Sequence, residues 1–378
     1  MPSFVQQRRV IQLAPAALQG WPGSGYWKDF QGRRILLEQL GVSTQFGWYD
    51  VQDLTGALAQ VDDLTTDVII EYSTCPALIS AIRQVHKQVR VHVRAHNAEA
   101  LQHWHRVQPS LWPTVDNLRK WYGTARMAVQ DRRCAALADT LLSISAWDLR
   151  HYWERLLPGG RCKCLPYFSP WPSLRPETRP LPWKAREHQV VCMPGGLDRL
   201  TRQQTELFGY LAKALRDSEP GNAPRCAMTN YSGDALADAS FVSSLGKIDD
   251  PWGLLCRSKG VAVLTDLGFG AKTTLFDGLA AGCRLFVHKG LIPRLPAAIQ
   301  PHCSAIDPAD WNASATLVRS QLESPPAGKD IAHSQLQAEA VDVMSSVLNL
   351  TDDMHIQSRT GDGLAAHRIL HAVEEELA

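Results

Sequence analysis

The stretch Val261–Gly282, with the sequence VAVLTDLGFGAKTTLFDGLAAG, gives the strongest indication of the fold. Its apolar start predicts a strand that ends at Leu264, and a helix is predicted to begin at Thr273 after a glycine-rich turn. The free N–H groups and positive dipole end of such a helix suit a phosphate. Lys272 adds a positive charge there, and Asp277 is predicted to accept hydrogen bonds from a ribose. The same kind of turn is also common where glycines serve packing alone.

Strand and helix patterns alternate on both sides of this stretch, which is typical of parallel sheets covered by helices. The strands are predicted at Val10–Leu13, Val42–Trp48, Asp67–Ile70, Val89–Val93 and Leu141–Ser145, and again at Gln189–Met193, Cys226–Asn230, Phe241–Leu245, Val261–Leu264 and Leu285–His288. The helices are predicted at Lys28–Leu40, Pro76–Val85, Thr201–Leu215 and Thr273–Ala280, with another that opens near Asn97. The fold class is therefore α/β.

The length of the chain, 378 residues, suits two domains of roughly 100 to 200 residues each. Six prolines between Pro166 and Trp183 exclude a helix interior or a central strand there, because proline fixes φ and lacks an N–H donor. We therefore predict an N-terminal domain over 1–168, a linker over 169–186 and a C-terminal domain over 187–350. The remaining segment, 351–378, is predicted to be helical and is placed to pack back toward the N-terminal domain.

The composition excludes several other classes of protein. A hydrophobic fraction of 45% with 20% charged residues is that of a globular protein, and no apolar run reaches the roughly 18 residues of a membrane-spanning helix. The first residues lack the apolar stretch of a secretory signal, so a cytoplasmic location is expected. Nine cysteines that occur singly along the chain indicate reduced thiols rather than a disulfide framework.

The near-neutral net charge of +1 hides a basic segment, Gln84–Lys163, which has thirteen basic and six acidic residues. Such a segment would attract an anionic acceptor or a membrane surface with acidic lipid, so peripheral contact with an anionic membrane is one hypothesis. A solvated basic face without a partner is the alternative. Binding to nucleic acid is not expected.

The stretch Val261–Gly282 resembles the retaining GT-B glycosyltransferases whose signature is a pair of glutamates eight positions apart. In that family the second glutamate binds the donor ribose and precedes Ala-Met/Leu-Ala-x-Gly, and Asp277-Gly278-Leu279-Ala280-Ala281-Gly282 stands at that place. The first glutamate would fall on Phe269, which has no carboxylate, so Asp266 or a backbone amide would have to replace it. The resemblance implies two Rossmann-like domains that face each other across a cleft.

The resemblance also implies an activity, the transfer of a sugar from a nucleotide-sugar donor to a glycan, glycolipid or other acceptor, with retention and as part of polysaccharide biosynthesis. No metal and no organic cofactor are expected. Arg202, together with Arg199, is expected to neutralise the charge of the diphosphate. Lys247 and Ile248 are expected to contact the nucleotide base. The remaining donor-binding residues are Gly23, Ser24 and Gly25 opposite the phosphates, and Gly268, Phe269, Gly270, Ala271 and Thr273 in the turn.

In the N-terminal domain the segment Val91–Glu99 is a strand that runs into a helix start. The resemblance places the end of this strand near the transferred sugar, so His96 joins Lys272 and Arg202 as a catalytic candidate. Glu71, Arg94 and Asn97 are predicted on the acceptor side. A lone histidine at such a place is also often purely structural.

Two other functions remain open. A non-catalytic binding or scaffold protein of the same fold is suggested by the missing glutamate at Phe269. A dehydrogenase that uses NAD is suggested by Gly20-x-x-Gly23-x-Gly25 and by Asp50, although the glycine order differs from Gly-x-Gly-x-x-Gly. The transferase hypothesis would be lost if the N–H groups at this helix start faced away from the cleft or were occupied by the protein's own side chains.

Overall fold

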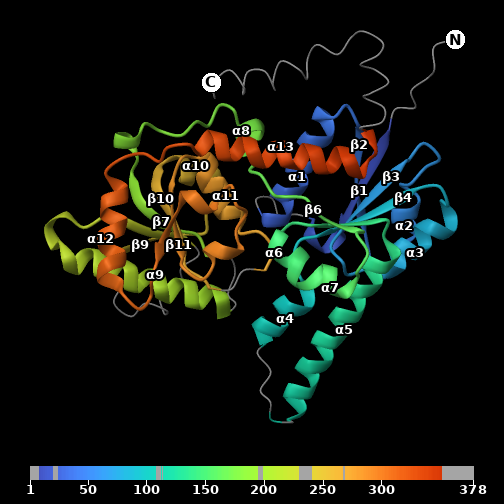
Figure 1. Ribbon diagram of the computed structural model, residues 1–378, viewed down its shortest axis with the longest axis horizontal. Coiled ribbons are helices and arrows are strands. Elements are labelled where there is room, and N and C mark those ends of the chain that lie inside the picture. Colours follow the sequence, from blue (N-terminus) through green and yellow to red (C-terminus); the bar gives the residue numbers. More distant parts are fainter. Residues whose placement is uncertain are drawn as a thin grey trace, which may run out of the picture.

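The computed structural model describes residues 8–19, 24–107, 112, 114–194, 199–229, 241–266 and 269–350. It contains two parallel sheets of six strands each, with helices packed on them (Figure 1). The N-terminal lobe runs through β1 (Arg9–Pro15), α1 (Gly25–Gln39), β2 (Ser43–Tyr49), α2 (Thr55–Leu58), β3 (Asp67–Glu71), α3 (Pro76–Val85), β4 (Arg90–Ala95), α4 (Glu99–Val107), α5 (Val115–Leu137), β5 (Thr140–Ser143), α6 (Ala146–Asp148), α7 (Glu154–Leu156) and β6 (Cys162–Cys164).

The C-terminal lobe follows a proline-rich connection. The connection contains α8 (Trp171–Leu174). The elements of the lobe are β7 (His188–Cys192), α9 (Arg199–Ser218), β8 (Cys226–Thr229), β9 (Val242–Gly246), α10 (Pro251–Cys256), β10 (Ser258–Val263), α11 (Thr273–Ala280), β11 (Arg284–His288), β12 (Cys303–Ile306), α12 (Trp311–Leu322) and α13 (Lys329–Val347). The predicted α/β class with two parallel sheets is confirmed.

The order of strands locates the place where each sheet can bind a ligand. The C-terminal sheet has the order β9-β8-β7-β10-β11-β12, so the strand order reverses between β7 and β10. The N-terminal sheet has the order β2-β1-β3-β4-β5-β6, with the corresponding point between β1 and β3. Ligands of open α/β sheets bind outside the carboxyl ends of the strands at such points. The glycine-rich turn follows β10 and therefore lies at this point of the C-terminal sheet.

Local sequence explains most of the elements. The strand β3, with the sequence DVIIE, is buried at every residue, as expected for a central strand covered on both faces. The helix α1 begins after Ser24, whose Oγ accepts a hydrogen bond from the N–H of Trp27 at 3.4 Å. The elements that were not predicted include the short strands β6 and β12, the long helices α5 and α12, and the short helices α2, α6, α7, α8 and α10.

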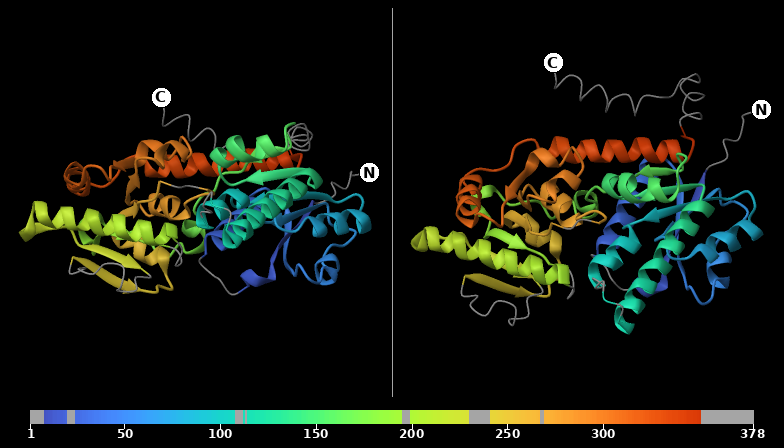
Figure 2. Two further views of the ribbon diagram at one scale, coloured as in Figure 1. Left: turned by 90° about the horizontal axis from the view of Figure 1, so that it is seen from below. Right: turned by 60° about the horizontal axis from the view of Figure 1, so that its bottom comes forward.

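One apolar core extends through both lobes. The buried residues Phe168, at the end of the N-terminal domain, and Trp171, in the linker, belong to the same hydrophobic cluster as residues of both sheets, and so does the buried face of α13. The guanidinium of Arg90 in β4 donates to the backbone carbonyls of Val347 and Leu348, each at 3.2 Å, so the end of α13 is held against the N-terminal lobe. Figures 1 and 2 show α13 reaching across from the C-terminal lobe. The segment predicted to pack back, 351–378, lies outside the described residues.

Among the described residues, no helix is both long and apolar enough to cross a membrane.

Candidate functional site

The glycine-rich turn before α11 touches two turns of the N-terminal lobe. A Cβ at Gly25, the first residue of α1, would lie 3.5 Å from the Oγ1 of Thr273, the first residue of α11. A Cβ at Gly270 would overlap the backbone carbonyl of His96 and the side-chain oxygen of Asn97. Gly270 also has a φ of +66°, a conformation that favours glycine. The turn is therefore fitted against the end of β4 by a residue that has no side chain.

One backbone N–H of this turn, that of Gly270, is occupied by one of the protein's own side chains, the carboxyl group of Asp148, so at this N–H the condition stated against the transferase hypothesis is met. Gly270 N donates to Asp148 Oδ2 at 2.7 Å, and Asp148 is fully buried. Burial raises the pKa of Asp148 to about 7, although the N–H of Gly270, the cations of Lys272 and Arg294 and the backbone of Ala98 all favour its charged form. Among the described residues, Oδ1 of the same carboxylate has no hydrogen bond of normal geometry.

An aromatic cluster surrounds this contact. The ring of Phe269 is buried between His105 of α4, at a centroid distance of 5.0 Å, and Trp147 of α6, at 5.9 Å. The guanidinium of Arg294 lies over the Trp147 ring, 4.7 Å from its centroid. At the position where the family would have a glutamate, this chain therefore places an aromatic residue that joins the two lobes.

Asp277 lies in a different environment from the one we predicted. Its side chain is buried, Oδ2 accepts from Lys28 Nζ of α1 at 2.5 Å, and Oδ1 accepts from the hydroxyl of Tyr167 at 2.8 Å. The reason is that α11 turns this residue toward α1 and the linker, and not toward the turn. In this structure Asp277 links the lobes through a buried ion pair, and its carboxylate is not open to a ribose.

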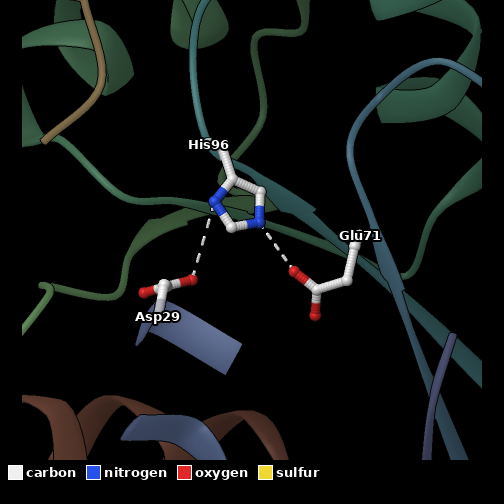
Figure 3. Close-up of side chains that lie close together, drawn as sticks. All are labelled: Asp29, Glu71 and His96. Carbon is white, nitrogen blue, oxygen red and sulfur yellow. Dashed lines mark hydrogen bonds and ion pairs between the residues drawn. The ribbon is translucent and has the colours of Figure 1, made fainter. Parts of the chain in front are cut away.

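A second group of charged residues lies at the carboxyl end of the N-terminal sheet. Figure 3 shows the His96 ring between two carboxylates. Its Nε2 lies 2.7 Å from Glu71 Oε2, and its Nδ1 lies 3.8 Å from Asp29 Oδ2. Arg94 binds Asp29 through two hydrogen bonds of 2.9 and 2.6 Å, and Arg33 pairs with both Asp29 and Glu71. Burial would raise the pKa of Asp29, but Arg33 and Arg94 hold it below its ordinary value.

These contacts revise the roles predicted for Glu71 and Arg94. Both side chains are fully buried, so they cannot reach an acceptor in this structure. They instead fix the position of His96, whose ring also stacks on Tyr72 at a centroid distance of 4.5 Å. Tyr72 follows β3 with a φ of +68°, a conformation that is rare for a bulky residue and is often found at functional sites.

The group Asp29, Glu71 and His96 could in principle hold a metal ion, because one ligand atom from each lies within 4.8 Å of the others. The guanidinium of Arg33 already pairs with both of its carboxylates, and that of Arg94 pairs with Asp29. Their two positive charges compensate the two negative ones, so the charge balance of this group favours an ion-pair network over a cation site.

The other predicted residues lie in different places. Lys247 is exposed after β9, and Ile248 packs against the core. Arg202 is exposed on the first turn of α9, where no described contact joins it to the glycine-rich turn. Ala271 is half-buried against the core beside Lys272. Gly23, Gly268 and the side chain of Arg199 lie outside the part of the chain that the structure describes.

Sequence reasoning missed Lys28, Asp29, Asp148 and Arg294. Each of these pairs with a residue far along the chain, such as Lys28 with Asp277, and no local pattern reports such a pairing. One signal was present, since Asp29 and Arg33 are four residues apart on a helix and can therefore pair, and the apolar positions around them show that this face is buried.

Comparisons with known proteins agree with the fold. No family model matches the chain, and no curated protein matches it. Three solved structures resemble it over nearly its whole length, each at 12% sequence identity. An alpha-glucosyltransferase in complex with UDP and a 13-mer DNA has a TM-score of 0.59 and covers 93% of this chain and 99% of its own. A glycosyltransferase from Rickettsia africae has a TM-score of 0.56 and covers 94% of this chain and 99% of its own. Anabaena HepE in complex with UDP has a TM-score of 0.52 and covers 93% of this chain and 100% of its own.

Likeness at this level of identity shows the fold. The two parallel six-stranded sheets, the reversal of strand order at the glycine-rich turn and the agreement over whole chains lead to one conclusion. This chain has the two-lobed α/β architecture of the GT-B fold.

Proposed function

We propose that the protein transfers a sugar from a nucleotide-sugar donor to an acceptor hydroxyl, with retention, and that uridine diphosphate is the leaving group. One observation carries the proposal. The N–H of Gly270, next to Lys272 and Arg294 and at the point of strand reversal in the C-terminal sheet, binds a carboxyl oxygen, that of Asp148, where a phosphate oxygen would be bound. UDP in two of the similar structures favours this nucleotide, and a glycan or glycolipid is the proposed acceptor.

The proposed chemistry moves negative charge onto the donor phosphate. The bond between the anomeric carbon and the phosphate oxygen breaks, the acceptor oxygen bonds to that carbon, and the hydroxyl proton leaves with the diphosphate. Preorganised N–H donors and cations stabilise such a charge most where water is excluded. The start of α11, Lys272 and Arg294 supply them here, and the proposal gives no role to a metal or an organic cofactor.

Asp148 occupies the position proposed for a phosphate oxygen of the donor. A carboxylate whose pKa burial raises to about 7 is less well stabilised there than in water, so its charged form is held weakly. A diphosphate offers more negative charge and more acceptor oxygens to the same N–H group and cations. We therefore propose that the donor displaces Asp148 from Gly270.

His96 is the proposed contact to the transferred sugar. Its backbone lies against Gly270, and its ring is held by Glu71, Asp29 and Tyr72. Because Nε2 is engaged by Glu71, Nδ1 is the ring atom that would offer the sugar a hydrogen bond at a constant position, which is the property that orientation of a sugar at the reacting bond requires.

A non-catalytic binding protein is the second candidate. It is favoured by the buried ion pair of Asp277 with Lys28 and by Phe269 at the place of the missing glutamate. Such a protein would bind the nucleotide or an acceptor without breaking the donor.

The decisive experiment combines binding with turnover. Calorimetry against UDP, GDP and ADP should show binding of UDP, and UDP-sugars should be hydrolysed or transferred in a panel of acceptors. Lys272→Ala should weaken UDP binding, whereas Lys184→Ala, which removes an exposed charge of the linker, should not. UDP binding without any turnover would favour the non-catalytic candidate, and no binding of any nucleotide would refute the proposal.

A further inference from the structure

The helix α5 presents an unusual outer surface. It has 23 residues, about 35 Å of helix, and with α4 it projects from the N-terminal lobe beyond the sheet (Figures 1 and 2). Its inner face is buried through Asn117, Asp131, Cys134 and Ala135. The opposite face is left uncovered by the described residues.

An apolar stripe runs along this outer face. Val115, Leu118, Tyr122 and Val129 follow at steps of three, four and seven residues, which places them on one side of a helix. These residues are strongly exposed to solvent, and the exposed fraction is 67% for Val115, 57% for Leu118 and 70% for Tyr122. Trp112, just before the helix, is 79% exposed as well. Exposed apolar groups that are contiguous in this way mark interaction surfaces.

A row of arginines follows the stripe. Arg119, Arg126 and Arg133 are seven residues apart, so they lie on one side of the helix next to the stripe, and all three are exposed. None of them forms an ion pair with a described residue. The acids of the helix do not offset this charge, because Asp131 is buried and Asp116 pairs with Lys120 at 2.5 Å.

We propose that the outer face of α5 docks on a membrane surface that contains anionic lipid. The stripe requires a partner with an apolar interior, and the arginine row requires negative charge at the edge of that interior. A bilayer with acidic headgroups provides both an apolar interior and negative charge at its edge, within the depth to which one face of a helix would be inserted. A DNA duplex would satisfy the arginines and leave the apolar stripe in water, so the charge and the apolar groups together favour lipid.

This surface is connected to the candidate site. Asp131, on the inner face of α5, accepts hydrogen bonds from Ser73 Oγ and from the Tyr152 hydroxyl, both at 2.5 Å. Ser73 is next to Tyr72, which stacks on His96. A membrane-bound α5 would hold the carboxyl end of the N-terminal sheet at a fixed distance from lipid headgroups. The docking proposal itself does not depend on the proposed transferase activity.

The test is flotation of the full-length protein with vesicles. Vesicles of phosphatidylcholine with about one third phosphatidylglycerol should bind the protein, pure phosphatidylcholine should bind it far less, and added salt should release it. The triple variant R119Q/R126Q/R133Q should bind about fivefold less per arginine removed, on the order of 100-fold in total. The double variant L118Q/Y122Q should also bind at least tenfold less, because it removes the apolar contact.

Two matched variants control for general changes in charge and surface. R179Q/K184Q/K213Q removes three exposed charges elsewhere, and Y210Q/I331Q removes two exposed apolar groups elsewhere, and both should bind as the wild type does. Equal binding to neutral and anionic vesicles would overturn the proposal, and so would binding that the stripe variant retains in full. Binding of a DNA duplex that depends on the arginines but not on Leu118 and Tyr122, without vesicle binding, would assign the surface to nucleic acid instead.

Discussion

Replacement of Asp148 by asparagine should make the protein's stability less sensitive to pH. Asparagine keeps an oxygen that can accept from Gly270 N, and it cannot ionise. In the wild type, burial raises the pKa of Asp148 from 3.8 to about 7, so the folded protein holds this proton more tightly than the unfolded chain does. The folded state is therefore favoured when Asp148 is protonated, and it loses stability as pH rises from about 4 to about 7.

The size of the effect follows from the pKa difference. Each pH unit between the two pKa values changes the free energy of unfolding by about 1.4 kcal/mol, which gives on the order of 4 kcal/mol over the whole range. Above pH 7 the loss is complete and the curve becomes flat. Asp148→Asn should therefore gain stability relative to the wild type as pH increases, by roughly 2 to 3 kcal/mol between pH 5 and pH 8.

Urea unfolding followed by tryptophan fluorescence at pH 5, 6, 7 and 8 measures this difference. Other carboxylates, such as Asp131, whose pKa burial raises to about 6, titrate in both proteins and cancel. Asp116→Asn, on the outside of α5, is the matched control and should show a difference from wild type that does not change with pH. A constant difference between Asp148→Asn and wild type from pH 5 to pH 8 would refute the conclusion that a buried carboxylate occupies the turn.

Two further predictions concern the contact between the lobes. Gly270→Ala should lower turnover on the order of 100-fold, because a Cβ there must displace the segment that directly follows β4. The control is Gly41→Ala, where φ is +68° and the added Cβ meets open space. This control should cost roughly 1 to 2 kcal/mol of stability and leave turnover unchanged. Equal turnover of the two variants would contradict this. Lys28→Met should destabilise the protein by about 3 to 5 kcal/mol, since it leaves the Asp277 carboxylate buried without its cation, and adding Asp277→Asn should recover most of the loss. Additive losses in this double-mutant cycle would show that the pair is not coupled.

Most strands of this fold, and the helices α1, α3, α4, α9 and α11, could be predicted because each has a local signature. The run VAVL before the glycine-rich turn and the start of α11 at Thr273 are examples. The strand β6, with only the residues CKC, is too short to show a pattern, and it becomes a strand through its pairing with β5. The helix α5 was missed because few of its buried residues are apolar, with Asn117 and Asp131 on the inner face.

The candidate site was predictable only in part. His96 and Gly270 could be placed from strand ends and glycines, and the structure brings them together across the lobes. The environment of Asp277 could not be predicted, because Lys28 lies 249 residues away in the sequence. The same reason applies to Asp148, whose partner Gly270 is 122 residues away. Local sequence patterns therefore predict which backbone segments lie at the binding site. Contacts between residues far apart in the sequence decide which side chains there can still contact a ligand.

The apolar core that continues from one sheet to the other has a consequence for the whole molecule. Each half contributes buried side chains to the same cluster, and α13 returns to the lobe in which the chain began. A protease that nicks the linker would therefore cut the backbone without separating the halves. Neither half produced alone would retain a complete interior, so the chain is expected to assemble and denature as one cooperative unit despite its two sheets.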